Sequence, residues 1–152
     1  MIRRALLAGL VLLAASAGAQ PVVQTTLGAV RGTAHDGIDA FRGIPYAAPP
    51  VGALRWRPPR AATAWTGVRE ADRFGPICPQ DLRAAPADMP QDEDCLTLNV
   101  YAPRQRPAAG LPVMVWIHGG SFRWGAGSLP AYDGVTFARQ GVVLVTLNYR
   151  LD

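Results

Sequence analysis

Two uninterrupted runs of apolar residues do most to constrain how this chain can fold. They are LPVMVWI at residues 111–117 and VVLVTL at 142–147. Such continuous runs are typical of strands that are covered on both faces in an α/β sheet. The stretch between them begins with glycines and then has the pattern of a short helix that ends at Gly141. The sequence therefore predicts an α/β fold with a crossover, whose two strands are parallel neighbours or lie one strand apart in a mostly parallel sheet.

The residues before these runs predict strands and turns. Two β-branched runs flank Leu27 and Gly28, which indicates a hairpin over residues 21–33. Residues 37–60 contain too many prolines for a long helix. At 95–103 apolar and polar side chains alternate, as in a strand with two different faces. With 152 residues, the chain has room for one ordinary domain.

The first 19 residues predict a secretory signal peptide. A basic start, MIRR, precedes an eleven-residue apolar run and the small residues Ala17, Gly18 and Ala19. Cleavage there leaves residues 20–152 as the mature chain. A membrane span needs about 20 apolar residues, and no other segment approaches that length. We therefore expect a secreted or periplasmic protein with no membrane span after cleavage.

The charge of the mature chain argues against nucleic acid as a partner. All 15 basic residues are arginine, and two of them lie in the predicted signal peptide. The remaining 13 arginines are set against 11 acidic residues, which leaves a net charge of +2. These arginines are scattered along the sequence, so a polyanion-binding surface is not expected.

The chain has two cysteines, Cys78 and Cys95. Export places them where a disulfide persists, and a bridge across the 16 intervening residues contributes about 3 kcal/mol in the chain-entropy model. Two free, half-buried thiols are the alternative. No histidine lies near either cysteine in the sequence, so neither a metal site nor a cofactor is predicted.

The segment WIHGGSFRWGAGS, residues 116–128, brings glycines to the end of the first apolar run. Gly119 and Gly120 let backbone N–H groups approach a ligand atom because no side chain intervenes. A phosphate loop needs a dinucleotide fingerprint or a lysine followed by serine or threonine, and the sequence has neither. The other use is an oxyanion hole, which stabilises charge on a carbonyl oxygen during acyl transfer. Lipases and esterases place a His-Gly-Gly segment in this way after a strand.

Seven segments together resemble the N-terminal part of the type-B carboxylesterases, the α/β-hydrolase family that includes bacterial esterases and the cholinesterases. They follow the family's order: GAVRG, FRGIPYAAPPVGALRW, WTGV, GPICPQ, EDCLTLNVYAP, LPVMVWIHGGSF and VVLVTLNYRL. The fifth is close to a signature pattern of the family. The resemblance implies an incomplete α/β-hydrolase fold, with the N-terminal hairpin and the first strands of its mostly parallel central sheet. It also implies a serine esterase whose partner is a small carboxylic ester.

The resemblance gives roles to residues in two loops. Gly119 opens the turn, and the backbone amides of Gly120 and Ser121 are the oxyanion donors. Ser121 stands where the family has a third glycine, so its Cβ must fit the required backbone conformation. Arg55 and Glu93 would form a buried ion pair at the closing end of the cysteine loop, or they are two unrelated surface charges.

Two interpretations stay open for Phe122 and Trp124, which follow the predicted donors: they line the acyl or alcohol pocket, or they cover the end of the sheet. In the cholinesterases a tryptophan of the cysteine loop receives the quaternary ammonium group. Residues 79–94 contain no aromatic side chain here, so a choline ester is not the expected substrate.

The sequence lacks the reacting residues of such an esterase. Its three serines are Ser16, Ser121 and Ser128, and none lies in a G-x-S-x-G turn. Of its two histidines, His35 lies in a polar turn and His118 is better placed to hold the glycine loop than to accept a proton. The family's order places the nucleophile, the acid and the base of the triad further along than this sequence extends.

We therefore expect the N-terminal part of a carboxylic-ester hydrolase, inactive by itself. The alternatives are a truncated inactive product, or a cholinesterase-like adhesion or binding module that uses the same fold without a nucleophile. The retained His-Gly-Gly loop favours the enzyme. We also expect the apolar strand at 142–149 to lack a neighbour, and both faces of the sheet to lack some covering helices. Such an apolar edge is prone to aggregation. The oligomeric state is not indicated by the sequence.

Overall fold

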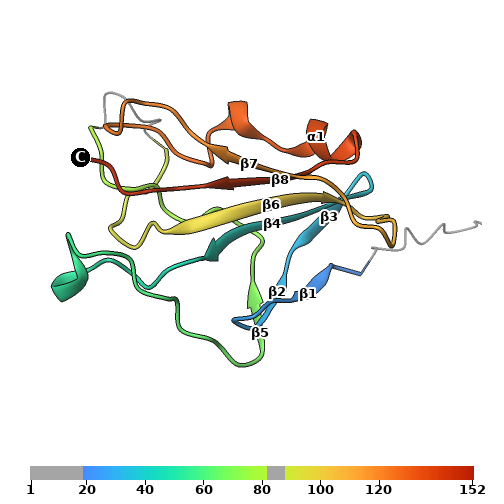
Figure 1. Cartoon of the computed structure of the whole chain (residues 1–152), viewed down its shortest axis with the longest axis horizontal. Coiled ribbons are helices and arrows are strands. Elements are labelled where there is room, and N and C mark those ends of the chain that lie inside the picture. The colour runs from blue at the N-terminus through green and yellow to red at the C-terminus, as the bar shows by residue number, and fades with distance from the viewer. Residues whose placement is uncertain (1–18, 82–87) are drawn as a thin grey trace, which may run out of the picture.

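The fold consists of two adjoining β-sheets and one short helix (Figure 1). The computed structural model describes residues 19–81 and 88–152. The predicted signal peptide therefore lies outside the described residues, apart from Ala19. Among the described residues, no helix is long and apolar enough to cross a membrane.

The smaller sheet has three strands in the order β1-β2-β5. They are β1 Val22–Gln24, β2 Ala29–Arg31 and β5 Val68–Glu70. β1 and β2 are antiparallel, with Val23 opposite Val30, and form the predicted hairpin. β5 pairs with β2 in parallel. Val30 shares a buried cluster with Phe41 of the larger sheet, so the two sheets have a common core at this point.

The larger sheet has five strands in the order β3-β4-β6-β8-β7. In chain order they are β3 Thr33–His35, β4 Ile38–Pro45, β6 Thr97–Pro103, β7 Val113–Ile117 and β8 Val143–Leu147. β7 and β8 are parallel neighbours, connected through the 3-10 turn η2 (Pro130–Tyr132) and the helix α1 (Val135–Arg139), so the predicted crossover is confirmed. The other strand pairs are antiparallel, so this part of the sheet is mixed.

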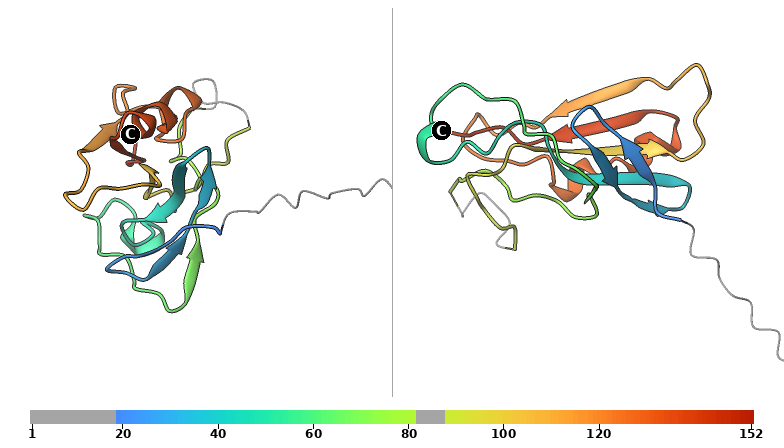
Figure 2. Two further views of the ribbon diagram at one scale, coloured as in Figure 1. Left: turned by 90° about the vertical axis from the view of Figure 1, so that its right-hand side faces the viewer. Right: turned by 90° about the horizontal axis from the view of Figure 1, so that it is seen from below.

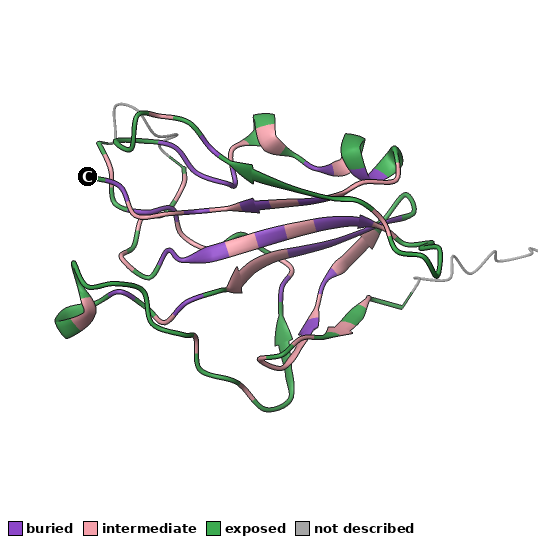
Figure 3. Cartoon of the chain, viewed as in Figure 1, coloured by how far each residue is buried: buried purple, intermediate pink, exposed green. Residues whose placement is uncertain are grey.

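The strand order differs from our expectation at one edge. β8 lies between β6 and β7, so the unpaired edge belongs to β7 and not to the run at 142–149. α1 packs on one face of the sheet against β4, β6 and β8 (Figure 2). The side chains of β7 are 41–65% exposed along the whole strand (Figure 3). Within the described residues the apolar run of β7 is therefore left uncovered, because α1 packs on β4, β6 and β8.

β6 has the two different faces that its sequence predicts, and its more buried face carries polar groups. Thr97, Asn99 and Tyr101 are buried, while the apolar residues between them are partly exposed. The Asn99 side-chain amide donates to the Thr146 hydroxyl at 3.0 Å and its oxygen accepts from the Gly43 N–H at 3.0 Å. Gly43 lies at the irregularity in the β4–β6 pairing, so β6 supplies the hydrogen bond that this bulge needs.

Candidate active site

The loop that follows β7, residues 118–128, runs close to the C-terminal residue of the chain (Figure 1). Three consecutive residues in it have a positive φ: Gly120 at 122°, Ser121 at 54° and Phe122 at 62°. A residue with a Cβ rarely adopts this conformation, which costs on the order of 1 kcal/mol or more. Ser121 thus takes the left-handed conformation despite its Cβ. Strained backbone of this kind clusters at functional sites.

Gly120 has no room for a side chain. A Cβ on Gly120 would lie 1.8 Å from the Trp124 carbonyl oxygen. The Gly120 carbonyl in turn accepts hydrogen bonds from the amides of Arg123 at 3.0 Å and Trp124 at 3.2 Å. A Cβ on Gly119, in contrast, would meet no atom within 4 Å. The loop backbone is therefore tightly packed around the Cα of Gly120, whereas there is space for a side chain at Gly119.

Gly120 and Ser121 line a cleft of about 460 Å³. The other residues that line this cleft are Asp81, Arg123, Trp124 and Asp152. Within the described residues, neither the Gly120 nor the Ser121 amide donates a hydrogen bond to the protein. Two adjacent N–H groups beside a cleft, neither of them used within the protein, can stabilise a negatively charged oxygen.

His118 fixes the start of the loop. Its ring is buried and stacks on the Tyr149 ring, with 4.2 Å between centroids and 14° between planes. The His118 Nδ1 lies 2.8 Å from the Gly119 carbonyl oxygen, which only accepts, so Nδ1 carries the proton of this hydrogen bond. The Tyr149 hydroxyl donates to the His118 carbonyl at 2.7 Å. The imidazole therefore holds the loop, as the sequence indicated.

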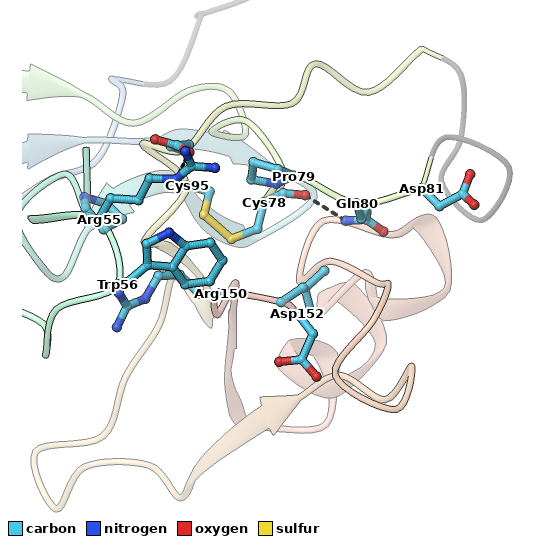
Figure 4. A pocket seen from close by; sticks show the side chains of 12 residues that line it. Arg55, Trp56, Cys78, Pro79, Gln80, Asp81, Cys95, Arg150 and Asp152 are labelled. Carbon is cyan, nitrogen blue, oxygen red and sulfur yellow. Dashed lines mark hydrogen bonds and ion pairs between the residues drawn. A yellow bond between two sulfur atoms is a disulfide. The ribbon is translucent and has the colours of Figure 1, made fainter. Parts of the chain in front are cut away.

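A disulfide between Cys78 and Cys95 forms one wall beside the loop (Figure 4). Two side-chain amides join this wall to the glycine loop. Gln80 hydrogen-bonds to the backbone of Gly125, and Asn148 accepts a hydrogen bond from the Gly127 N–H. The sequence interpretation missed both amides, although they lie in two of the segments that carried the family resemblance, GPICPQ and VVLVTLNYRL.

Arg55 and Glu93 lie together beside the disulfide, where they line a second cleft of about 340 Å³ (Figure 4). The Arg55 Nε is 2.6 Å from the Glu93 Oε1. The side chains are 57% and 34% exposed, so Arg55 and Glu93 form an ion pair that is only partly buried. Arg55 directly follows the 3-10 turn η1 (Gly52–Leu54), and its guanidinium lies over the exposed Trp56 ring. The Arg55–Glu93 pair therefore lies at the surface of this cleft.

The two aromatic residues after the predicted donors have different surroundings. Trp124 is one of the residues that line the cleft with Gly120 and Ser121. Phe122 is 67% exposed, and its ring meets the Tyr149 ring edge-on at 6.1 Å between centroids. Trp124 is therefore the better candidate for contact with a bound molecule.

Tyr46 supports the segment behind the loop. Its hydroxyl donates to the Asn148 carbonyl at 2.7 Å. Burial raises the pKa of the Tyr46 hydroxyl above its usual value, and the nearby Arg150 charge opposes this shift. The phenol consequently remains protonated at neutral and mildly alkaline pH, so this hydrogen bond is kept.

The other candidate groups form no catalytic arrangement in the part of the chain that the structure describes. No set of His, Cys, Asp and Glu side chains there could hold a metal ion. His35 is exposed, with its Nδ1 3.4 Å from the Asp36 carboxylate. Ser128 is buried at the far end of the glycine loop. What this region can contribute to a reaction is therefore its backbone amides.

The profile of the Carboxylesterase family matches residues 19–152. Fumonisin B1 esterase of Sphingopyxis macrogoltabida is 50% identical over 131 residues, which are 85% of this chain and 24% of that protein. The para-nitrobenzyl esterase of Bacillus subtilis is 50% identical over 135 residues, 86% of this chain and 27% of that protein. This chain thus spans about a quarter of the length of these relatives.

A solved structure of a PNB esterase is similar to this chain in fold. It superposes with a TM-score of 0.80 at 49% sequence identity, and the match covers 88% of this chain and 27% of that one. The likeness in structure therefore extends over most of this chain.

Proposed function

This chain belongs to the Carboxylesterase family, and on that basis we propose that residues 20–152 are the N-terminal part of a serine esterase domain and supply its oxyanion hole. One observation carries the proposal: the adjacent amides of Gly120 and Ser121 have no hydrogen-bond acceptor within the described residues and lie beside a cleft. A module that only binds a partner has no need of two such amides held in a strained turn. The enzyme is therefore favoured over an adhesion module.

The two amides act on the carbonyl oxygen of the ester. Attack by a serine hydroxyl on the carbonyl carbon moves charge onto that oxygen, and donors already in position stabilise the charge. Removing one such donor typically costs about 3 kcal/mol of transition-state stabilisation. No serine of this sequence lies in a G-x-S-x-G turn, so we assign the nucleophile, base and acid to a segment beyond these 152 residues.

The proposed substrate is a small-molecule carboxylic ester that carries no quaternary ammonium group. The two relatives are named for fumonisin B1 and for para-nitrobenzyl esters. Trp124 offers an apolar ring at the cleft, while residues 79–94 contain no aromatic side chain that could hold a quaternary ammonium group. A para-nitrobenzyl or para-nitrophenyl ester is therefore a suitable probe.

A chimera tests this function. Residues 20–152 replace the matching segment of the Bacillus subtilis para-nitrobenzyl esterase, to which they are 50% identical. We expect this esterase chimera to hydrolyse a para-nitrobenzyl ester. Ser121→Pro removes one donor and cannot adopt the φ of 54°, so kcat/KM should fall by about 10²-fold or more.

Ser121→Gly is the matched control for that experiment. It keeps the amide and relieves the left-handed strain, so the chimera should retain its activity. Loss of activity in Ser121→Gly would point to the hydroxyl instead of the amide. Full turnover by Ser121→Pro, with the fold intact by circular dichroism, would refute the oxyanion assignment.

We also propose that the protein is exported, which the leader-like residues 1–19 and the disulfide support. Expression of the chain with its own N-terminus in a bacterial host should yield a periplasmic product that begins at Gln20, as read by N-terminal sequencing. A version that lacks residues 2–19 is the control and should stay in the cytoplasm. Recovery of the unprocessed chain from the cytoplasm would contradict export.

A further inference from the structure

We infer that Gln80 is a positioning residue for the oxyanion hole, acting through Gly125 on the amides of Gly120 and Ser121. This inference rests on the function proposed above and adds to it a residue that touches neither the ester nor the nucleophile. Gln80 lies two residues after Cys78, in the disulfide loop, where it lines the second cleft, and its side chain is hydrogen-bonded to Gly125 of the glycine loop (Figure 4).

The side-chain amide of Gln80 uses both of its ends. Its Oε1 accepts from the Gly125 N–H at 2.8 Å, and its Nε2 donates to the Gly125 carbonyl at 3.0 Å. The same Nε2 donates to the Cys78 carbonyl at 3.0 Å. The backbone N–H of Gln80 donates to the Gln91 Oε1 at 2.8 Å, which fixes where the side chain starts. Only a carboxamide offers a donor and an acceptor side by side in this way.

Gly125, which Gln80 holds in place, packs against the residues at the start of the loop. Its φ is 119°, and a Cβ on it would lie 2.4 Å from the His118 Nδ1 and 2.7 Å from the Gly119 carbonyl oxygen. The next residue back, Trp124, has its carbonyl oxygen against Gly120. Residues 124 and 125 are therefore packed directly on residues 118–120. A shift of Gly125 cannot leave the Gly120 and Ser121 amides in place.

Asn148 holds the other end of the loop to the same disulfide. Its Oδ1 accepts from the Gly127 N–H at 2.8 Å, and its Nδ2 donates to the carbonyls of Cys95 at 3.2 Å and Pro76 at 3.0 Å. The carbonyls of both cysteines thus receive a hydrogen bond from an amide that also holds the glycine loop. Asn148 is buried, whereas Gln80 is only partly buried in the lining of the second cleft, so Gln80 is the residue that can be changed with less effect on folding.

The experiment uses the esterase chimera and two substitutions of Gln80. Gln80→Glu keeps the shape and the acceptor but turns an oxygen toward two carbonyl oxygens. Gln80→Met removes all three side-chain hydrogen bonds without adding charge. Misplacement of a catalytic group by about 1 Å can cost about 10²-fold. We therefore expect both variants to lose about 10-fold to 10²-fold in kcat with little change in KM.

A transition-state analogue separates positioning from general structure. An aryl trifluoromethyl ketone forms a tetrahedral adduct whose oxygen occupies the oxyanion hole, so its Ki should rise in both variants by the same factor by which kcat/KM falls. Gln140→Glu is the matched control. Gln140 is exposed at the end of α1, and its substitution makes the same change in charge away from the loop. It should leave kcat, KM and Ki unchanged.

The outcomes are distinct. If Gln80→Glu and Gln80→Met keep the kcat and Ki of the parent chimera, the positioning role is overturned and the proposed function stands. A fall in thermal stability or a rise in KM, with kcat and Ki unchanged, also overturns it, because Gln80 then serves only the fold. If Gln80→Glu fails to fold, Gln80→Met decides the question alone. A folded parent chimera without esterase activity overturns the proposed function itself.

Discussion

β7 and the loop that follows it are consecutive in sequence but differ in how many contacts with the rest of the chain hold them in place. The five apolar side chains of β7 are 41–65% exposed, and the strand is paired only with β8. From His118 onward the loop is held by hydrogen bonds with the side chains of Gln80, Asn148 and Tyr149. The geometry of the candidate oxyanion hole is therefore set within this chain, whereas the strand leading to it needs cover that these residues do not provide.

The largest expected effect concerns the uncovered strand. The polypeptide 20–152 should self-associate, because an apolar edge offers unpaired backbone groups to another chain. Val113→Lys with Ile117→Lys places charges on β7, whose residues at 113 and 117 are 62% and 65% exposed, and should shift the protein to a monomer in sedimentation velocity.

The control for this prediction is a pair of lysines on an exposed polar surface. Thr136→Lys with Gln140→Lys adds the same charge on α1 and should leave the association unchanged. A parent polypeptide that sediments as a monomer with a cooperative unfolding transition would show that the β7 edge needs no cover.

The next effect concerns the loop. Gly120→Ala places a Cβ 1.8 Å from the Trp124 carbonyl oxygen at a backbone φ of 122°, so the turn must move. Since the displaced amides no longer meet the oxyanion, kcat of the esterase chimera should fall by about 10²-fold or more. Steady-state kinetics with a para-nitrobenzyl ester measures the loss.

Gly110→Ala is the control that separates the effect of backbone strain from the effect of the steric clash at Gly120. Gly110 also has a positive φ, 81°, but a Cβ there would meet no atom within 4 Å. Its substitution should lower stability by about 1 kcal/mol and leave kcat unchanged. Equal activity in Gly120→Ala and Gly110→Ala would mean that the position of the Gly120 amide does not matter for the reaction.

Local patterns in the sequence were sufficient for the hairpin, the crossover from β7 to β8, the alternation of β6 and the location of the glycine loop. Each of these depends on residues close together in the chain. The place of β7 at the edge depends on which strands pair over long distances, and no local pattern records that. The same holds for Gln80, whose partner Gly125 is 45 residues away.

The third prediction compares the two amides that hold the loop. Asn148→Leu leaves the Gly127 N–H and two carbonyls in the interior without their partner, and each unsatisfied group costs about 1–3 kcal/mol. We expect the esterase chimera to lose about 3 kcal/mol in its free energy of unfolding by urea. The exposed control Gln140→Leu should lose almost nothing.

Gln80→Met should show the reverse pattern to Asn148→Leu, with a small loss of stability and a large loss of kcat. The buried amide then serves mainly the fold, and the partly buried one serves the position of the donors. If both variants lose only stability, the loop is held equally by both amides, and neither has a separate effect on the reaction.

The smallest expected effect concerns the Arg55–Glu93 pair. Its atoms are 2.6 Å apart, but the side chains are 57% and 34% exposed, and exposed pairs contribute at most about 1 kcal/mol. Glu93→Gln in the esterase chimera should therefore lower the free energy of unfolding by less than about 1 kcal/mol at low salt. The difference should vanish at about 1 M salt, where the screening length is about 3 Å. A loss of about 3 kcal/mol that persists at high salt is typical of a buried pair. Such a loss would show that the rest of the esterase covers this cleft, as it must cover β7. The closing end of the disulfide loop would then depend on the rest of the esterase, as the sheet edge does, whereas the glycine loop is held within this chain.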